Sequence, residues 1–320
     1  MGSDGSPANV THLTEDALRD WPLPTPSGHG DKDDRGRVLV IAGSREMPGA
    51  VILAATAALR AGAGKLTIAT GESVASLVAL ATPEARVIPL PETIAGGIAA
   101  SAVDRLEALG RECDAVLIGP GMLDELAVCG FVRAFLTTLR PIKVVLDAAA
   151  MGVVRLDCEY SHETGNAQWR GTLSYGDIHR FAHPVLLTPH AGEMAHLTSA
   201  DKAAILANSS DAARNAALRW NAVVALKGAI THIATPDGRM WRHEGGNLGL
   251  AISGSGDALS GLIVGLASRG ASLEQAAAWG VTLHARAGQQ LAARFGTLGY
   301  LAREIAAEVP ALMDALGRRR

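Results

Sequence analysis

The chain of 320 residues has few aromatic side chains, few charges and almost no cysteine. Aromatic residues make up 4% of the sequence and charged residues 19%, and the formal net charge is −3. The lysines and arginines are scattered along the chain, so they form no basic surface large enough to hold a nucleic-acid backbone. We therefore expect no nucleic-acid partner.

The three cysteines, Cys113, Cys129 and Cys158, have neither an even number nor the spacing of metal ligands. Reduced thiols in a cytoplasmic protein are the simplest account of them. The opening residues, MGSDGSPANV, lack the basic and apolar regions of a signal peptide. No apolar run reaches the roughly 18 residues that a membrane span needs. We expect a cytoplasmic location and no membrane partner.

Hydrophobic residues are abundant, at 48%, and the chain has 36 glycines. Short apolar runs of β type alternate with longer alanine-rich stretches of helical period, a pattern typical of a mostly parallel sheet with crossover helices. Because most runs are apolar at nearly every position, we expect helices on both faces of the sheet. The predicted strands lie within residues 37–43, 65–70, 86–90, 114–121, 143–150, 184–190 and 222–228.

The segments between the strands predict further elements. Residues 47–64 favour a helix, with Pro48 near its start and glycines at its end. Residues 229–245 predict a hairpin around the turn PDG, and residues 257–294 are helical in pattern. The polar segment 152–183 has no clear periodicity, so we expect weak structure there.

The predicted domain organisation is simple. Residues 1–35 are expected to form a partly flexible lead-in segment, and residues 36–320 a single α/β domain. Several predicted strands end in a glycine or polar turn, and in an open α/β sheet ligands lie beyond the carboxyl ends of the strands. These turns therefore predict one cleft. They lie at residues 42–44, 119–121, 147–150, 188–193 and 226–231.

The stretch SGSGDALSG, residues 253–261, carries the strongest chemical signal. Gly254 and Gly256 leave backbone amides open to an anion, and the helix that follows offers unpaired N–H groups. Asp257, in the first turn, is expected to stay ionised. It can accept a hydroxyl proton while the amides neutralise a phosphoryl group in transfer. The alternative is that Asp257 only caps the helix and the glycines only make a turn.

Lys227 directly follows a predicted buried strand, a placement suited to binding nucleotide phosphates. The chain contains no G-x-x-x-x-G-K-[ST] sequence, so it is not a P-loop enzyme. His190 follows another strand and is interpreted either as a ligand contact or as a histidine bonded at the strand end. Asp147 and Glu193 either act near a Mg²⁺ ion or cap the helices that follow them. His284 is interpreted as a core or interface histidine.

Seven motifs in the same order resemble those of the ADP-dependent (S)-NAD(P)H-hydrate dehydratase family, which belongs to the ribokinase-like superfamily. The resemblance runs from about Gly36 to about Pro310. It implies a three-layer α/β/α fold with a mostly parallel central sheet. The motifs are GRVLVIAGSREMPGAVILAATAALRAGAGKLTIAT, AVLIGPGM, VVLDAAAM, LLTPHAGEMAHL, ALKGAITHIATPDG, GNLGLAISGSGDALSG and GYLAREIAAEVP.

The resemblance also implies a reaction. ADP phosphorylates the hydroxyl of (6S)-NAD(P)H hydrate, and phosphate then leaves to restore NADH or NADPH, with AMP as the other product. Asp257 is the implied base, and Ala50, Gly121, His190 and Asp257 are the implied hydrate contacts. The implied adenine-nucleotide contacts are Lys227, Gly228, Ala229, Ile230, Thr231, Gly254, Ser255 and Gly256.

The same resemblance implies a Mg²⁺ ion on the nucleotide phosphates, held by water and phosphate oxygens rather than by a set of protein ligands. It also implies a homotetramer and a separate NAD(P)H-hydrate epimerase as functional partner. It leaves open the choice of ADP or ATP and of NADH or NADPH hydrate. The sequence departs from the family pattern at Ala149, where a second acid or a glycine is common, so one possible polar contact is missing.

Two other functions fit the same motifs. One is a true small-molecule kinase of the superfamily, acting on hydroxymethylpyrimidine or hydroxyethylthiazole. The other is a nucleotide-binding sensor without turnover. Product analysis separates them, because only the dehydratase releases free phosphate and restores the reduced nicotinamide.

Overall fold

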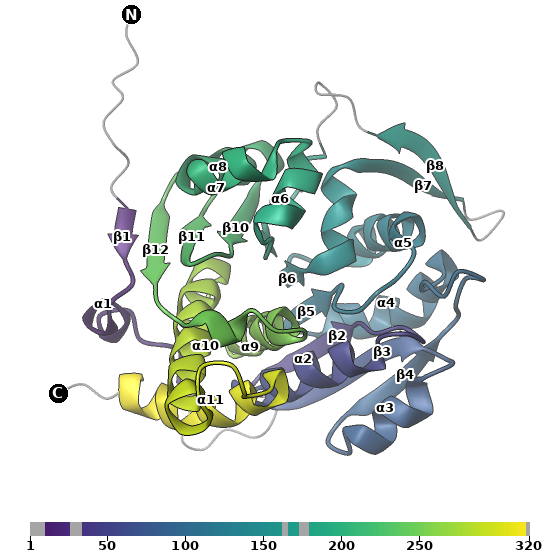
Figure 1. The fold of residues 1–320 in the computed structure, drawn as a ribbon. Helices are drawn as coiled ribbons and strands as arrows, with labels where there is room; N and C mark the ends of the chain where they lie inside the picture. The colour runs from purple at the N-terminus through teal and green to yellow at the C-terminus, as the bar shows by residue number, and fades with distance from the viewer. Residues whose placement is uncertain (1–9, 26–33, 162–165, 173–178, 318–320) are drawn as a thin grey trace, which may run out of the picture.

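The computed structural model describes residues 10–25, 34–161, 166–172 and 179–317. A ten-stranded sheet runs through the molecule in the order β1-β12-β11-β10-β9-β6-β5-β2-β3-β4 (Figure 1). Only β11 runs antiparallel to its neighbours. The strands are β1 (Val10–His12), β2 (Arg37–Ile41), β3 (Lys65–Gly71), β4 (Arg86–Leu90), β5 (Ala115–Ile118), β6 (Lys143–Leu146), β9 (Val185–Leu187), β10 (Ala222–Leu226), β11 (Ile230–Ala234) and β12 (Met240–Glu244).

The strand predictions are confirmed, since each of the seven predicted runs contains one strand of the sheet. The predicted hairpin is confirmed as well, because β11 and β12 pair antiparallel across the turn that holds Gly238. Gly238 has a φ of 89°, a left-handed conformation that favours glycine in this turn.

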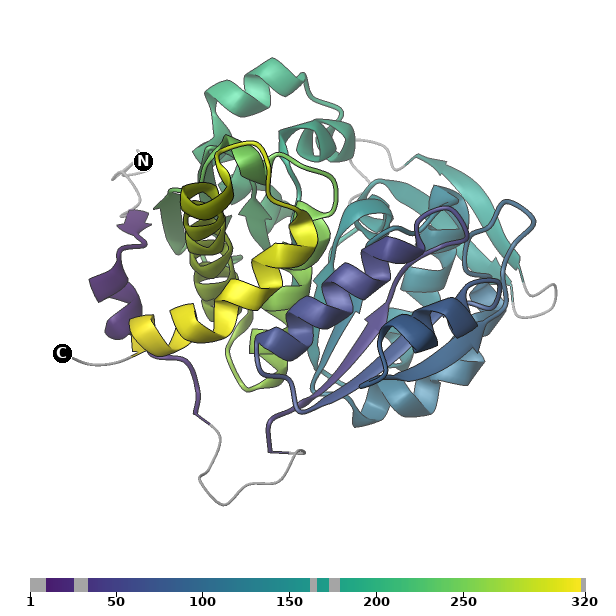
Figure 2. The ribbon, with the colours of Figure 1, turned by 60° about the horizontal axis from the view of Figure 1, so that its bottom comes forward.

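Helices cover both faces of the sheet, as the continuous apolar strands predict. In β2, Val38 and Val40 pack on one face, and Leu39 and Ile41 pack on the other. Successive side chains of a strand point to opposite faces, so a strand buried on both sides must be apolar throughout. Figure 2 shows α2 and α11 on the face turned toward the viewer.

The helices follow the predicted pattern. The prediction for 47–64 is confirmed by α2, which begins at Pro48, and the helical pattern of 257–294 is confirmed by α9 and α10. Within the described residues, none of the helices has the length and apolarity needed to span a bilayer. The helices are α1 (Glu15–Arg19), α2 (Pro48–Arg60), α3 (Ala75–Ala81), α4 (Val103–Glu112), α5 (Glu125–Thr138), α6 (Ala191–Thr198), α7 (Lys202–Ala207), α8 (Ser209–Trp220), α9 (Ser255–Ser268), α10 (Leu273–Phe295) and α11 (Ala302–Gly317).

Helices α2 and α9 touch backbone to backbone. A Cβ atom on Gly261 of α9 would lie 2.2 Å from the carbonyl oxygen of Ala54, and one on Gly265 would lie 2.5 Å from that of Ala58. Neither glycine can therefore accept a side chain unless the helices move apart. This glycine-alanine contact, which we call the α2–α9 seam, joins the middle and C-terminal turns of the two helices and so fixes the helices relative to each other.

The polar segment 152–183 departs from its prediction. It contains β7 (Leu156–Ser161) and β8 (Asn166–Thr172), which pair as an antiparallel two-stranded sheet beside α5 (Figure 1). Residues 162–165 and 173–178 lie outside the described part of the chain. Backbone pairing rather than an apolar pattern defines this hairpin, and so the periodicity of the sequence gave no sign of it.

The expectation of reduced thiols is wrong for one cysteine. Cys113 is a free, buried thiol, and burial raises its pKa to about 12. Cys129, within α5, is disulfide-bonded. The linear spacing of three cysteines could not reveal this, because a disulfide depends on which elements the fold places together.

Part of the predicted lead-in segment belongs to the sheet. Strand β1 pairs in parallel with β12, and Trp21 stacks on Trp241 with 5.5 Å between the ring centroids. The indole N–H of Trp279 donates to the carbonyl oxygen of Trp21 at 2.9 Å. Within the predicted segment 1–35, residues 1–9 and 26–33 lie outside the described part. Residues 10–25 thus extend the fold rather than precede it.

Candidate active site

The turns at the carboxyl ends of the strands are joined to one another by hydrogen bonds. The N–H of Gly43 donates to Pro120 at 2.7 Å, and that of Asp147 donates to Ile118 at 3.0 Å. Further along the edge, the N–H of Lys227 donates to Pro189 at 2.8 Å. The predicted convergence of these turns on one edge of the sheet is confirmed.

A cavity of about 820 Å³ opens at this edge, beside the hairpin β11–β12 and the first turn of α9. Six of the eight predicted nucleotide contacts line it, and Ile230 and Gly254 do not. Its lining residues are His190, Lys227, Gly228, Ala229, Thr231, His243, Gly245, Gly246, Asn247, Leu248, Leu250, Ala251, Ile252, Ser255, Gly256, Leu259, Val281, His284 and Ala285.

The first turn of α9 has the features of an anion-binding site. Gly254 precedes the helix with a φ of 87°, and no side chain caps this N-terminus. The N-cap position is therefore occupied by Gly254, and Asp257 lies in the first turn of the helix. Gly256 leaves room for a ligand, since a Cβ atom there would lie 3.5 Å from Lys227 Nζ. Open amides, a missing side chain and a nearby ammonium together favour a phosphate.

Lys227 lies among carboxylates. Its Nζ is 3.4 Å from Asp147 Oδ1 and 3.8 Å from Glu193 Oε2. Asp147 is buried, and its Oδ1 also accepts the hydroxyl hydrogen of Thr188 at 2.7 Å. Burial by itself would lower the pKa of Lys227, but the surrounding carboxylates, Asp147 first, raise it above its usual value. The ammonium is therefore held charged before any phosphate arrives.

Asp257 belongs to the same cluster of charges. Burial, with a further contribution from the charge of Asp147, raises its pKa from 3.8 to about 6, although Lys227 opposes the shift. The expectation of a firmly ionised carboxylate needs correction, because the helix N-terminus does not outweigh burial beside other acids. The carboxylate is ionised at neutral pH and is a stronger base than an ordinary aspartate.

His190 and Glu193 form a capping box at the start of α6. His190 Nδ1 accepts the N–H of Glu193 at 3.0 Å, and Glu193 Oε2 accepts the N–H of His190 at 2.7 Å. In the neutral ring the proton must then sit on Nε2. The imidazole is 60% exposed and lines the cavity. The hydrogen bonds agree with the interpretation of His190 as a histidine bonded at the strand end, and its interpretation as a ligand contact stays a prediction. Glu193 is a helix cap that also faces Lys227.

Ala50 and Gly121, two predicted hydrate contacts, lie side by side. A Cβ atom on Gly121, which has a φ of 64°, would be 2.5 Å from Ala50 Cβ. Neither residue lines the 820 Å³ cavity, and neither does Asp257, whereas His190 does. Gly254 packs against Leu53 of α2, so the start of α9, which lines the cavity through Ser255 and Gly256, also contacts the helix that carries Ala50.

Four side chains at this edge were not predicted as site residues. Thr188 orients Asp147, and His243, Asn247 and His284 line the cavity. Asn247 Oδ1 accepts hydrogens from Gly249 N and from Tyr300 Oη, at 2.8 and 2.9 Å. The threonine followed a predicted strand and could have been found by that position. The two histidines lie in a strand and in an apolar helix, where the sequence offers no such signal.

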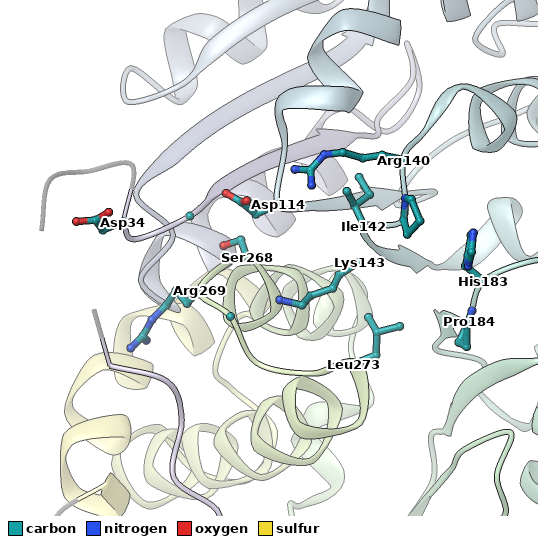
Figure 3. Close-up of a pocket in the computed structure, with 13 residues that line it drawn as sticks. Asp34, Asp114, Arg140, Ile142, Lys143, His183, Pro184, Ser268, Arg269 and Leu273 are labelled. Atoms are coloured by element: carbon teal, nitrogen blue, oxygen red, sulfur yellow. The ribbon is translucent and has the colours of Figure 1, made fainter. Parts of the chain in front are cut away.

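A second cavity, of about 620 Å³, lies at the amino ends of the strands (Figure 3). Three basic side chains that line it donate hydrogen bonds to backbone carbonyl oxygens. Lys143 donates to Ala267, Arg269 to Ala61 and Pro24, and Arg140 to Arg111 and Cys113. Most of these bonds cap the C-terminal ends of helices, which carry partial negative charge. We therefore look for the active site at the opposite edge of the sheet.

The sheet, its two helical layers and a phosphate-sized opening at a helix N-terminus define a nucleotide-binding protein with the ribokinase-like fold. The profile of the NAD(P)H-hydrate dehydratase family matches residues 38–311. The chain belongs to this family.

Individual relatives agree with this assignment. An ADP-dependent (S)-NAD(P)H-hydrate dehydratase of Xanthomonas campestris pv. campestris is 47% identical over 97% of the chain and 98% of its own length. A crystal structure of the ADP/ATP-dependent NAD(P)H-hydrate dehydratase from Bacillus subtilis, co-crystallised with ATP and Mg²⁺, superposes with a TM-score of 0.78 at 29% identity, covering 96% of this chain and 99% of that one.

Other relatives are longer. A bifunctional NAD(P)H-hydrate repair enzyme of Moorella thermoacetica is 38% identical over 92% of this chain, which corresponds to 52% of the repair enzyme. The chain thus spans about half of that relative and nearly all of the Xanthomonas protein.

Proposed function

We propose that this protein catalyses the ADP-dependent dehydration of (6S)-NAD(P)H hydrate, restoring NAD(P)H and releasing AMP and phosphate. The single observation that carries the proposal is the position of Asp257. Its carboxylate, with a pKa raised to about 6, shares a charge cluster with Lys227 on the open N-terminus of α9. The proposed base and the proposed phosphate-binding N–H groups thus lie in the same first turn of α9.

The nucleotide occupies the 820 Å³ cavity in this proposal. Its phosphates bind Lys227 and the amides around Gly256, with the remaining contacts supplied by Gly228, Ala229, Thr231 and Ser255, which line the same cavity. The hydrated nicotinamide binds against Ala50, Gly121 and His190, and His190, which also lines the cavity, lies where the two substrates meet. In this proposal Asp257 lies between the two substrates, as a transfer from one to the other requires.

The reaction has two steps. Asp257 removes the proton of the ring hydroxyl while the hydroxyl oxygen attacks the β-phosphorus of ADP. The bond between this phosphorus and the oxygen that stays on AMP breaks. Lys227 and the helix N–H groups hold the negative charge of the transferring group. Phosphate then leaves, expelled by the electron pair of the ring nitrogen, and loss of a proton from the neighbouring ring carbon restores the double bond. Phosphate is a far better leaving group than hydroxide at neutral pH.

The residues present fit a Mg²⁺ ion that is bound mainly by phosphate oxygens and water. Within the described ranges no group of three or more His, Cys, Asp or Glu side chains is placed to hold a metal. Asp147 and Glu193, with Asp257, bring more negative charge to the cluster than Lys227 neutralises. We propose that Asp147 and Glu193 hold the water shell of the ion, which supplies charge neutralisation to the phosphates when bound.

Three further proposals concern context. We propose a homotetramer, checked by light scattering. A separate epimerase supplies the S epimer from the R epimer, a pairing that the bifunctional relatives support. We place the enzyme in the cytoplasm, where nicotinamide and adenine nucleotides occur. Because disulfides are rare in that compartment and Cys129 is disulfide-bonded, cell fractionation is the direct test.

Incubation with hydrated NADH or NADPH plus ADP or ATP tests the function when AMP, phosphate and reduced cofactor are followed together. With ADP, equal amounts of all three products are expected. A stable phosphorylated alcohol would instead identify a small-molecule kinase. ADP binding without any turnover would identify a nucleotide sensor. The same assay shows which donor and which hydrate are preferred.

A further inference from the structure

His284, in α10, contacts the first residue of α9. Its Nε2 lies 3.0 Å from Ser255 Oγ and 3.1 Å from the carbonyl oxygen of Ser255. Both side chains are buried, with 8% of His284 and 5% of Ser255 exposed, and both line the nucleotide cavity. Ser255 lies between Gly254 and Gly256, so this contact reaches the anion-binding turn directly.

The carbonyl oxygen fixes the protonation of the ring. A carbonyl only accepts hydrogen bonds, so Nε2 must carry the hydrogen, and Nδ1 of the neutral ring carries none. Burial, together with the nearby Lys227 and His243, lowers the pKa of His284 to about 4, despite the bond to Ser255. The imidazole of His284 is therefore neutral at neutral pH.

The protonated Nε2 in turn fixes the direction of the serine hydroxyl. A nitrogen that carries a hydrogen cannot accept another, so Ser255 Oγ faces His284 as an acceptor, and its own hydrogen must point elsewhere. Lys227 and the amides of α9 already surround the cavity beside it. The hydroxyl hydrogen of Ser255 then points into this space, where it can be donated to an oxygen of a bound phosphate group.

We propose that His284 is a positioning residue that holds the Ser255 hydroxyl as a hydrogen-bond donor to a phosphate of the nucleoside diphosphate. This inference rests on the proposed nucleotide site, although it does not depend on what the second substrate is. His284 itself need not touch the nucleotide. It acts through Ser255, and its substitution should have no effect once the serine hydroxyl is absent.

The test compares ADP binding to the wild type and to five variants by titration calorimetry. Ser255→Ala and His284→Leu should each weaken ADP binding about tenfold, because one hydrogen bond to a charged oxygen is lost. The double variant should bind no more weakly than either single variant. His284→Gln, whose amide can place an N–H near the original Nε2, should retain most of the affinity. His183→Leu, in the cavity at the other edge, is the matched control and should bind normally.

A second measurement reads the tautomer directly. Nitrogen-15 NMR of the imidazoles should show His284 neutral with its hydrogen on Nε2, both without and with ADP. Additive losses in the double variant, an unchanged affinity of His284→Leu, or a hydrogen on Nδ1 would each overturn the inference. If His284→Leu does not fold, Ser255→Ala, His284→Gln and the NMR result decide. Wild-type protein that binds ADP but converts no hydrate would overturn the proposed function alone.

Discussion

Lys227 Nζ lies 3.5 Å from the point where a side chain on Gly256 would begin. The lysine comes from the end of β10 and the glycine from the first turn of α9, so two elements far apart in sequence enclose one small space. A phosphate bound there contacts an ammonium on one side and helix N–H groups on the other. The space between Lys227 and the helix stays open because Gly256 has only a hydrogen where other residues have a side chain.

Gly256→Ala should therefore weaken nucleotide binding without unfolding the protein. The new methyl group would make only an ordinary contact with Lys227, but it would stand where a phosphate approaches the amides. We expect the KM for ADP to rise roughly 10- to 100-fold, equivalent to about 1.4–2.7 kcal/mol. Gly317→Ala, at the end of α11 with no neighbour within 4 Å, is the matched control. An unchanged KM for Gly256→Ala would place the phosphates elsewhere.

Lys227→Met should reduce both activity and stability. It leaves the buried carboxylate of Asp147 without its ammonium, a change that typically costs about 3–5 kcal/mol. Adding Asp147→Asn should restore much of the unfolding free energy, because the uncompensated charge is gone, while turnover stays low. Urea denaturation and the coupled assay measure the two effects. If the second substitution restored turnover, Lys227 would serve the fold rather than the phosphates.

Asp257→Asn should lower kcat by roughly 10²–10⁴-fold, the usual contribution of a general base. In the wild type, kcat/KM should fall as the pH drops below about 6, where Asp257 becomes protonated. The variant should lack this inflection. A pH profile that is the same in both proteins would assign the base to another group.

The same substitution should stabilise the folded protein at neutral pH. The folded pKa of Asp257 lies above its ordinary 3.8, so ionisation favours the unfolded chain, and stability falls as the pH rises through about 6. Allowing for partial exposure, the gain in Asp257→Asn is on the order of 1–2 kcal/mol at pH 7. Thermal unfolding at pH 3.5 and pH 7.5 checks the sign, because the gain should be nearly absent below the ordinary pKa of 3.8 and complete above about 6.

Substitutions of His190 can separate its two roles. Asparagine is also a good N-cap, so His190→Asn should keep the capping bond to Glu193 and remove only the imidazole. We expect nearly unchanged stability and a KM for the hydrate about tenfold higher. His190→Ala should lose in addition about 1 kcal/mol of stability. Equal hydrate KM values for His190→Asn and the wild type would reduce His190 to a helix cap.

The parts of the fold that the sequence predicted are those with a local signal. The strand β2 is apolar from Val38 to Ile41, and the turn at Gly238 needs a residue that accepts positive φ. By contrast, β1 is three residues long and exists because β12 offers it an edge. The β7–β8 hairpin depends on pairing partners as well. Non-local pairing of this kind leaves no periodic pattern in the chain.

The site divides in the same way. Asp257, Lys227 and Gly256 sit at ends of elements where glycines and charges interrupt apolar sequence, so they could be predicted. The environment of Asp257 could not, because its pKa is set by burial and by Asp147, which arrives from another strand. His284 was hidden for a related reason. It sits inside a helix that looks like core, and only the packing of α10 on α9 brings it to Ser255.

The α2–α9 seam bears on how the enzyme can move. Ala50 lies in the first turn of α2 and Asp257 in the first turn of α9, so the proposed substrate contact and the proposed base belong to two helices that pack as one rigid unit. A hinge movement that brings α2 and α9 together on substrate binding is therefore excluded, because the two helices are already in backbone contact. An opening that admits substrate or frees product has to come from the turns and the β11–β12 hairpin around these two helices, because the spacing between Ala50 and Asp257 is set when the chain folds.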